Sequence, residues 1–248
     1  MSLSVTLSPR QKPAQALLGW RILVEQGLSA KEQMARDVAL AVETLPTARF
    51  FCWEPAAISF GLKQKPPAWF DQRSWQQAKL ESVERPTGGG IAFHGSDVSL
   101  SVIVPRRLQV SLGALMDAVC QNALSLCESL GVDAHTVLEA PAKGRINYCL
   151  TDLSPYAVMI AGKKVAGFAL RRFPQTWLIQ GSFLVRPISE PLSQAIPAEV
   201  LKQLKTKAIA FSEAASGTWD EKKLAVAWAQ GWAHWWEETL LETLAKEE

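Results

Sequence analysis

The sequence predicts a single α+β domain with a mixed β-sheet. Segments rich in β-branched and aromatic residues concentrate between residues 48 and 185, and segments with helical periodicity are inserted among them and follow them. No internal repeat or low-complexity segment divides the chain, and 248 residues are enough to bury a substantial core. We therefore expect residues 1–248 to form one domain, on which residues 190–248 pack as a helical C-terminal extension.

A helix followed by two short strands is predicted at the start of this region. Residues 28–45 repeat apolar side chains at helical intervals, and Ser29 and Glu32 have the spacing of a capping box at the beginning of that helix. Residues 48–64 are rich in aromatic and β-branched side chains and are interrupted at Pro55. This pattern predicts two strands on either side of a turn.

Further strands and one long helix are predicted between residues 82 and 185. Strands are expected at residues 82–85 and at residues 97–105, where apolar and small polar side chains alternate until a proline. Residues 111–131 predict a helix that begins after a capping serine and ends at a glycine. Residues 156–172 predict a β-hairpin, and residues 177–185 predict the next strand.

A tryptophan-rich helix is predicted near the C-terminal end. Thr218 and Glu221 have capping-box spacing, so we expect the helix to begin at Thr218. Five of the ten tryptophans follow residue 218, and four of them, Trp228, Trp232, Trp235 and Trp236, fall close to one side of this helix. The pattern favours core packing, and a partner-docking face is the alternative.

Composition and charge exclude several classes of function. The formal net charge is only +2, which implies no strong field for nucleic acid or a membrane surface. No stretch approaches the roughly 18 apolar residues of a membrane span, and the first residues lack the apolar core of a signal peptide. The four cysteines have neither metal-ligand spacing nor the density of a disulfide scaffold. We expect a cytoplasmic protein with no metal site and with neither nucleic-acid nor membrane partners.

The glycine run in residues 85–95, RPTGGGIAFHG, is the most distinctive motif. A Walker loop would end in Gly-Lys-Ser/Thr and a Rossmann motif would open a helix, whereas these glycines lie between two predicted strands. Three glycines allow backbone conformations closed to other residues and a close approach to a ligand or another strand. A turn without chemistry is the alternative, and His94 alone is more often a structural histidine than a catalytic one.

Cys149 is the cysteine whose surroundings favour reactivity. Cys120 and Cys127 fall on one face of a predicted helix, where small core residues are expected. Cys149 lies instead in a polar, turn-rich segment that follows Lys143 and Arg145. Cations near an exposed thiol favour the thiolate, which is the nucleophilic form. These observations leave a catalytic and a structural role open.

Lys163 and Lys164 are consecutive at the tip of the predicted hairpin. Because successive side chains of a strand face opposite ways, one lysine can be solvated while the other enters a cleft. A lysine held in a cleft can stabilise an oxyanion or move a proton, whereas a solvated turn is the ordinary alternative. Contact with Cys149 requires residues 143–155 to fold back.

Several spaced motifs together resemble the superfamily of biotin and lipoate protein ligases and octanoyltransferases. The motifs are RPTGGGIAFHGSDVSLSV, YAVMIAGKKVAGFALRR and WLIQGSFLV, which follow one another in the expected order. The resemblance covers residues 30–190. It implies a fold like that of class II aminoacyl-tRNA synthetases and biotin protein ligases, in which an α+β domain has a mixed, largely antiparallel sheet flanked by helices.

Within that superfamily, the chain resembles octanoyltransferases of the LipM and LipL type. These place a cysteine ahead of a hairpin with the spacing that Cys149, Tyr156 and Lys164 have here. The resemblance implies that Cys149 is the nucleophile, which accepts octanoate as a thioester, and that Lys164 is the catalytic lysine at the acyl carbonyl. It also implies that the substrate is bound by a further set of residues, which are Arg85, Thr87, Gly88, Gly89, Gly90, His94 and Gly167.

The implied activity is an octanoyltransferase of lipoate biosynthesis that needs no cofactor. Its donor would be octanoyl-acyl carrier protein or an octanoylated H protein. Its acceptor would be a lysine of a lipoyl domain, in the H protein or in the E2 subunit of a 2-oxoacid dehydrogenase. An ATP-dependent lipoate-protein ligase, with ATP and magnesium, is the first alternative, although Pro86 and Gly95 depart from the ligase motif. A non-catalytic protein that binds lipoyl domains or acyl chains is the second.

Overall fold

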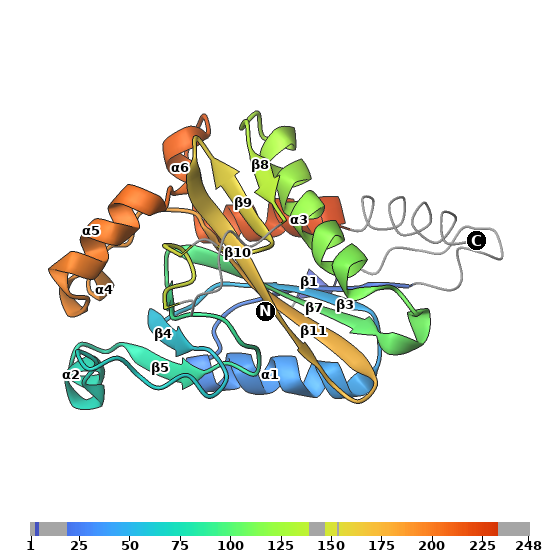
Figure 1. Cartoon of the computed structure of the whole chain (residues 1–248), viewed down its shortest axis with the longest axis horizontal. Coiled ribbons are helices and arrows are strands. Elements are labelled where there is room, and N and C mark those ends of the chain that lie inside the picture. Colours follow the sequence, from blue (N-terminus) through green and yellow to red (C-terminus); the bar gives the residue numbers. More distant parts are fainter. Residues whose placement is uncertain (1–2, 5–18, 139–146, 153, 233–248) are drawn as a thin grey trace.

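The computed structural model describes residues 3–4, 19–138, 147–152 and 154–232. Eight strands form one large sheet. These strands are β1 (Leu3–Ser4), β2 (Arg21–Glu25), β3 (Thr47–Phe51), β7 (Asp97–Pro105), β8 (His135–Val137), β9 (Ala157–Ile160), β10 (Lys163–Arg172) and β11 (Thr176–Leu184). Their order in the sheet is β1-β2-β3-β7-β11-β10-β9-β8 (Figure 1).

The pairing of these strands is mostly antiparallel. In the large sheet β2 and β3 are parallel, and every other neighbouring pair is antiparallel. A second sheet contains β4 (Ala57–Phe60), β5 (Glu81–Glu84) and β6 (Ala92–His94), with β4 in the middle, parallel to β5 and antiparallel to β6. The predicted α+β fold with a mixed, largely antiparallel sheet is therefore confirmed.

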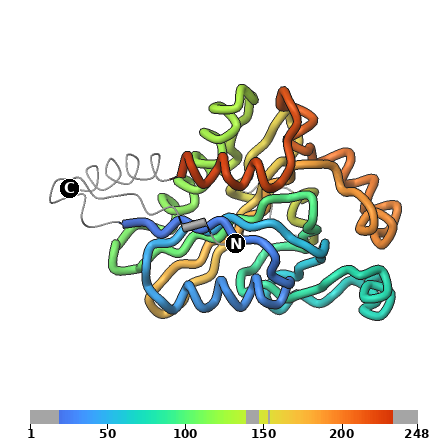
Figure 2. Tube along the Cα trace, turned by 180° about the vertical axis from the view of Figure 1, so that it is seen from behind, coloured from blue at the N-terminus to red at the C-terminus, as the bar shows by residue number. Residues whose placement is uncertain are grey.

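Helices cover both faces of the large sheet. The helices of the described residues are α1 (Ala30–Glu43), α2 (Gln72–Gln77), α3 (Leu112–Ser129), α4 (Leu192–Ala195), α5 (Ala198–Lys207), α6 (Phe211–Ala214) and residues 221–232. Figures 1 and 2 show α1 on one face and α3 with residues 221–232 on the other. The main hydrophobic core lies on the α3 side, and a smaller cluster that includes Leu40 and Leu178 lies under α1.

Strand β7 explains why part of the α1 face of the sheet is polar. All nine of its residues are buried. Val98, Leu100 and Val102 belong to the core on the α3 side. Ser101, on the opposite face, donates a hydrogen bond to Asp37 of α1. The alternation in the sequence thus separates an apolar core from a buried polar layer, and the second layer lines the candidate site.

Most predicted elements are present with shifted ends. Helix α1 begins after Ser29, whose side chain and Glu32 form the predicted capping box. Helix α3 begins after Ser111, which caps it, and the predicted hairpin is the β9-β10 pair. The two strands around Pro55 exist as β3 and β4, but they belong to different sheets.

The predicted start of the last helix is wrong. The helical residues begin at 221, and the carboxylate of Asp220 accepts a hydrogen bond from the amide of Lys223 (2.8 Å), so Asp220 is the cap. Glu221 accepts instead from the Arg186 guanidinium at 2.7 and 2.8 Å, which removes it from a capping box with Thr218. The sequence pattern also missed β1, β2, β6, β8 and α2, and it predicted a helical extension after residue 190 without placing the individual helices α4 to α6.

The tryptophans that the structure describes in the last helix are core residues. Trp228 and Trp232 are almost fully buried and contact Phe50 of β3 with ring centroids 5.3 and 5.7 Å apart. Trp228 also donates to Asn122 of α3 (2.7 Å). Core packing is confirmed for these two, whereas Trp235 and Trp236 lie outside the described residues.

The division into one domain with a C-terminal extension stays a prediction. After residue 190 the described part of the chain consists of α4, α5, α6 and the helical residues 221–232. Over the residues for which coordinates are described, no helix has the length and apolar character needed to cross a membrane.

Candidate active site

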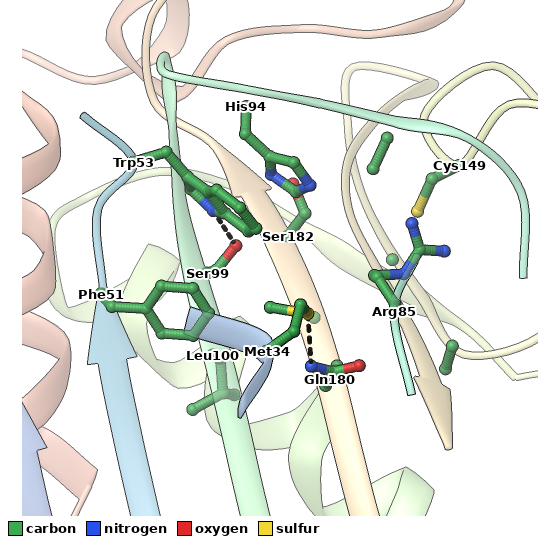
Figure 3. A pocket seen from close by; sticks show the side chains of 14 residues that line it. Met34, Phe51, Trp53, Arg85, His94, Ser99, Leu100, Cys149, Gln180 and Ser182 are labelled. Carbon is green, nitrogen blue, oxygen red and sulfur yellow. Dashed lines mark hydrogen bonds between the residues drawn. The ribbon is translucent and has the colours of Figure 1, made fainter. Parts of the chain in front are cut away.

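A narrow pocket lies between α1, the large sheet and the residues around the glycine run (Figure 3). Its volume is about 30 Å³, enough for about one or two water molecules. Figure 3 shows Cys149 and Arg85 together on one side and Phe51 and Trp53 on the opposite side. The lining also includes Met34, Ala92, His94, Ser99, Leu100, Gly167, Ala169, Gln180, Gly181 and Ser182.

The glycine run forms a loop that packs against strand β4. Gly89 has a φ of +90°, a conformation that glycine adopts without strain. A side chain built on Gly61 would come within 2.2 Å of the Gly89 carbonyl oxygen, so the two backbones touch. The Leu62 amide donates to the carbonyl of Thr87 (2.8 Å) and fixes the loop to the end of β4. The close approach of the two segments therefore depends on the missing side chain of Gly61, whereas Gly89 contributes its positive φ.

The segment that carries Cys149 is joined to the end of the glycine run. The amide of Ile91 donates to the carbonyl of Asn147, and the amide of Cys149 donates to the carbonyl of Ile91, both at 2.7 Å. These two bonds are a short parallel bridge that turns residues 147–152 toward the sheet. The expected folding back of this segment is thus observed, while Lys143 and Arg145 lie outside the described residues.

Lys164 is buried and Lys163 is not, as the alternation along a strand predicts. The Lys164 side chain is 2% exposed, and its Nζ donates to Ser154 Oγ (2.7 Å) and to the carbonyl of Asp152 (3.2 Å). Burial lowers the pKa of Lys164, and the nearby charges of Cys149 and Asp152 oppose that shift. A register shift between Lys164 and Ala166 marks a β-bulge, a feature that re-aims side chains.

Cys149 and Lys164 converge on Gly167. A Cβ atom built on Gly167 would lie 3.0 Å from Lys164 Nζ and 3.4 Å from Cys149 Sγ. The thiol and the amine therefore lie no further apart than the sum of those two distances. Because Gly167 has no side chain, the two groups approach the same point, an arrangement that can bring a thiol nucleophile to the carbon and an N–H donor to the oxygen of one carbonyl group.

Arg85 supplies a second positive charge next to the thiol. Its guanidinium donates to the carbonyls of Gly88 (3.1 Å) and Gly90 (2.7 Å), and Figure 3 shows Cys149 Sγ pointing toward it. Burial lowers the pKa of Arg85, and the charge of Cys149 opposes that shift. Two buried cations, Arg85 and Lys164, thus flank Cys149.

The predicted substrate-binding residues fall into two groups. Arg85, His94 and Gly167 line the pocket together with Cys149. The fully buried Thr87 is not itself a lining residue, but it donates a hydrogen bond to Gln180, which is one (2.6 Å). Gly88, Gly89 and Gly90 lie behind Arg85 rather than in the wall, so their role as substrate contacts stays a prediction.

Other residues in the pocket wall or in contact with it escaped the sequence analysis. Trp53 stacks on His94 with ring centroids 4.0 Å apart, and its indole N–H donates to Ser99 (2.8 Å). Ser59 of β4 contacts both Arg85 and His94. Each belongs to a different segment and has no local motif, so only the assembled fold brings them to the site. Within the described part of the chain, no three His, Cys, Asp or Glu residues gather to hold a metal ion.

Comparison with known proteins agrees with this fold. Residues 29–216 match the family model described as "Lipoyl protein ligase A/B catalytic domain". An octanoyltransferase LipM of Brevibacillus brevis is 29% identical to this chain, over 86% of each sequence. A LipM of an Exiguobacterium species is 30% identical, over 84% of this chain and 80% of that protein.

Solved structures share the fold at lower identity. A bipartite lipoate protein ligase from Thermoplasma acidophilum superposes with a TM-score of 0.69 and 19% identity, over 93% of this chain and 91% of that one. A lipoate-protein ligase A bound with ATP has a TM-score of 0.69 and 18% identity, over 93% of each chain.

Proposed function

Because the chain belongs to the lipoyl protein ligase A/B catalytic domain family, we propose that it is an octanoyltransferase of lipoate biosynthesis, the activity named for its LipM relatives. One observation carries the proposal. Cys149 Sγ and Lys164 Nζ meet beside Gly167, with Cys149 in the wall of a mainly apolar pocket. A thiol so placed suits acyl transfer through a thioester, whereas adenylate chemistry needs no cysteine.

In the first half-reaction Cys149 takes the octanoyl group from a donor thioester. The thiolate attacks the carbonyl carbon, a new S–C bond forms, and the carbon–sulfur bond of the donor breaks. The donor leaves as a thiolate and takes up a proton. This proton balances the one that Cys149 lost when its thiolate formed. Two N–H groups of Lys164 have partners among the described residues, which leaves the third for the carbonyl oxygen.

In the second half-reaction the octanoyl group moves to the amine of a lysine on a lipoyl domain. The neutral amine attacks the acyl-Cys149 carbon, the amide bond forms, and the Cys149 thiolate leaves. The proton lost by the amine returns to the thiolate, so the enzyme is regenerated. The donor in our proposal is octanoyl-acyl carrier protein or an octanoylated H protein, and the acceptor domain belongs to an H protein or an E2 subunit.

The pocket is the site that we assign to the octanoyl chain. Its open volume is too small for eight carbons, so side chains must move on binding. Met34 is the candidate for that movement, because methionine is unbranched and flexible, and its sulfur accepts only a long contact from Gln180 (3.5 Å). Burying about seven methylene-sized groups at ~0.8 kcal/mol each contributes roughly 5 kcal/mol to binding.

The transfer that we propose uses neither ATP nor a metal ion, because the thioester bond of the donor already activates the acyl group. We place the protein in the cytoplasm. The four cysteines of the chain are all free thiols, which fits a reducing compartment.

Mass spectrometry without ATP tests this function. The protein is incubated with octanoyl-acyl carrier protein or octanoylated H protein, and its intact mass is measured before and after a lipoyl domain is added. We expect one octanoyl group on the enzyme, which then moves to the lipoyl domain. The absence of an adduct, together with ATP-dependent lipoylation, would indicate a ligase, and the absence of both activities would indicate an accessory binding protein.

Replacing Gly167 with alanine is expected to slow transfer roughly 10- to 100-fold, because small displacements of reacting groups are costly. The new methyl group would lie 2.8 Å from Lys164 Cε, so the flexible lysine must move while the backbone stays in place. Turnover and thermal unfolding are measured together. Gly113→Ala, where nothing lies within 4 Å of the added atom, is the matched control. Equal turnover in the two variants would contradict the role assigned to Gly167.

A further inference from the structure

Arg85 is connected to a carboxylate inside the fold by three successive hydrogen bonds. Arg85 Nη1 lies 2.7 Å from Ser59 Oγ, which lies 2.6 Å from His94 Nε2. His94 Nδ1 lies in turn 2.8 Å from Asp97 Oδ2. Ser59 and Asp97 are fully buried, and His94 and Arg85 are 2% and 7% exposed. The chain of bonds leads from the wall beside Cys149 to the first residue of β7.

The chemistry of these groups determines which group donates and which accepts in each of the three hydrogen bonds. The Asp97 carboxylate only accepts, so the proton between it and the ring lies on His94 Nδ1. In the neutral ring, His94 Nε2 is then an acceptor, and the hydroxyl of Ser59 donates to it. Arg85 only donates, so it uses a lone pair of Ser59 Oγ. Each group therefore donates to the next, from Arg85 to Asp97.

Asp97 and His94, at the inner end of this series of hydrogen bonds, are held in place by further contacts. Asp97 also accepts from Ser182 Oγ (2.7 Å), Ser99 Oγ (3.3 Å) and the amide of Gly95 (3.2 Å). Trp53 stacks on the His94 ring at an interplanar angle of 16°. The position and the plane of the imidazole are thereby determined by the sheet.

The outer end of this series of hydrogen bonds is Arg85, whose positive charge no acceptor among the described residues neutralises. Arg85 donates to Ser59 Oγ, to the Ser59 carbonyl (3.0 Å) and to the carbonyls of Gly88 and Gly90. All four acceptors are neutral, so they orient the guanidinium and leave its charge in place. Gly88 and Gly90 belong to the loop itself, whereas Ser59 belongs to the paired strand β4 and attaches Arg85 to the framework.

We propose that Ser59, His94 and Asp97 are positioning residues that hold the Arg85 guanidinium against the Cys149 thiol. The positive charge then stands where the thiolate forms and where the carbonyl oxygen becomes negative during transfer. This role rests on the proposed function, since it concerns the same cysteine. It also goes beyond that function, because it assigns a task to two residues, Ser59 and Asp97, outside the acyl-transfer pair.

The test measures charge at Cys149 without using any acyl substrate. Iodoacetate is anionic and iodoacetamide is neutral, yet the two reagents are of similar size and alkylate the same thiolate. The rate of labelling of the Cys149 peptide by each reagent is followed by mass spectrometry, and their ratio is compared among variants. A cation held beside the thiolate attracts the anionic reagent and raises the iodoacetate-to-iodoacetamide ratio. A change in the solvent accessibility of the thiol changes both labelling rates together and leaves the ratio the same.

We expect Ser59→Ala and Asp97→Asn each to lower the iodoacetate-to-iodoacetamide ratio roughly fivefold, the effect of one displaced charge a few ångströms away. Ser59→Thr keeps the hydroxyl and is expected to keep the ratio. Ser101→Ala is the matched control, because Ser101 is also a fully buried strand serine that donates to a carboxylate, Asp37 (2.5 Å). It should leave the ratio at the wild-type value.

A ratio unchanged in both Ser59→Ala and Asp97→Asn, or lowered equally in Ser101→Ala, would overturn the proposal. If Ser59→Ala fails to fold, the Asp97→Asn variant alone decides. The outcome is independent of the octanoyl assay. A wild-type protein that shows the charge preference but gains no octanoyl group would refute the transferase function and leave the positioning role of Ser59 and Asp97 intact.

Discussion

The Cys149→Ala variant is expected to gain no octanoyl group and to transfer octanoate at least roughly 10³-fold more slowly than the wild type. Alanine removes the only atom of this side chain that can form a thioester, and no other thiol reaches the pocket from the described residues. Cys149 is also only partly buried, so its removal leaves the core intact.

Cys127→Ala is the matched control for this experiment. Cys127 is fully buried in α3, and burial raises the pKa of its thiol to about 12, so it stays protonated at neutral pH. We expect this variant to be acylated like the wild type, with at most a loss of stability. Acylation that persists in Cys149→Ala but disappears in Cys127→Ala would show that the nucleophile has been assigned to the wrong cysteine.

The Lys164→Met variant is expected to lose transfer by roughly 10² to 10⁴-fold, the usual effect of removing a catalytic proton-transfer or oxyanion group. Methionine fills a similar volume but offers no N–H group to the acyl carbonyl. The same change should raise the free energy of unfolding by about 1 kcal/mol, because a desolvated ammonium group is replaced by an apolar side chain. Active sites typically contain residues that are needed for activity but lower the stability of the folded protein.

The gain in stability of the Lys164→Met variant over the wild type should decrease as pH rises. The pKa of Lys164 is lowered in the folded protein, so between its folded and unfolded pKa values the unfolded chain binds more protons. The wild type therefore becomes more stable as pH rises through that window, while the Lys164→Met variant lacks this contribution. The advantage of the variant is largest below the folded pKa and shrinks as pH approaches the ordinary lysine value.

Lys163→Met separates the role of Lys164 from a general effect of charge. Lys163 is the preceding residue of β10 and is partly exposed, and the one partner of its amine within the described ranges is the carbonyl of Lys205 (3.4 Å). We expect nearly wild-type transfer and a change in unfolding free energy within about 0.5 kcal/mol, as for most surface substitutions. Both lysines are compared by chemical denaturation at several pH values and by the octanoyl-transfer assay. Equal losses of transfer in the two variants would remove Lys164 from the mechanism.

Local signals predicted the regular elements because the physics that forms them is local. Ser29 and Glu32 cap α1 through groups only three residues apart, and the alternation in residues 97–105 follows from the geometry of one strand. The start of the last helix was misplaced because Glu221 had a stronger partner in Arg186, which is distant in sequence. Short elements such as β8 and α4 depend on their neighbours and carry little local signal.

The sequence by itself predicted the fold class and the family resemblance, and through that resemblance it indicated Cys149 and Lys164 as the candidate pair, because these depend on residue types at fixed spacings along the chain. Only the tertiary structure decided that both groups meet at Gly167, that Thr87 faces Gln180, and that Ser59 joins Arg85 to His94. The reason is physical. A hydrogen bond or a close approach is set by distances in space, and here those distances join segments from different strands.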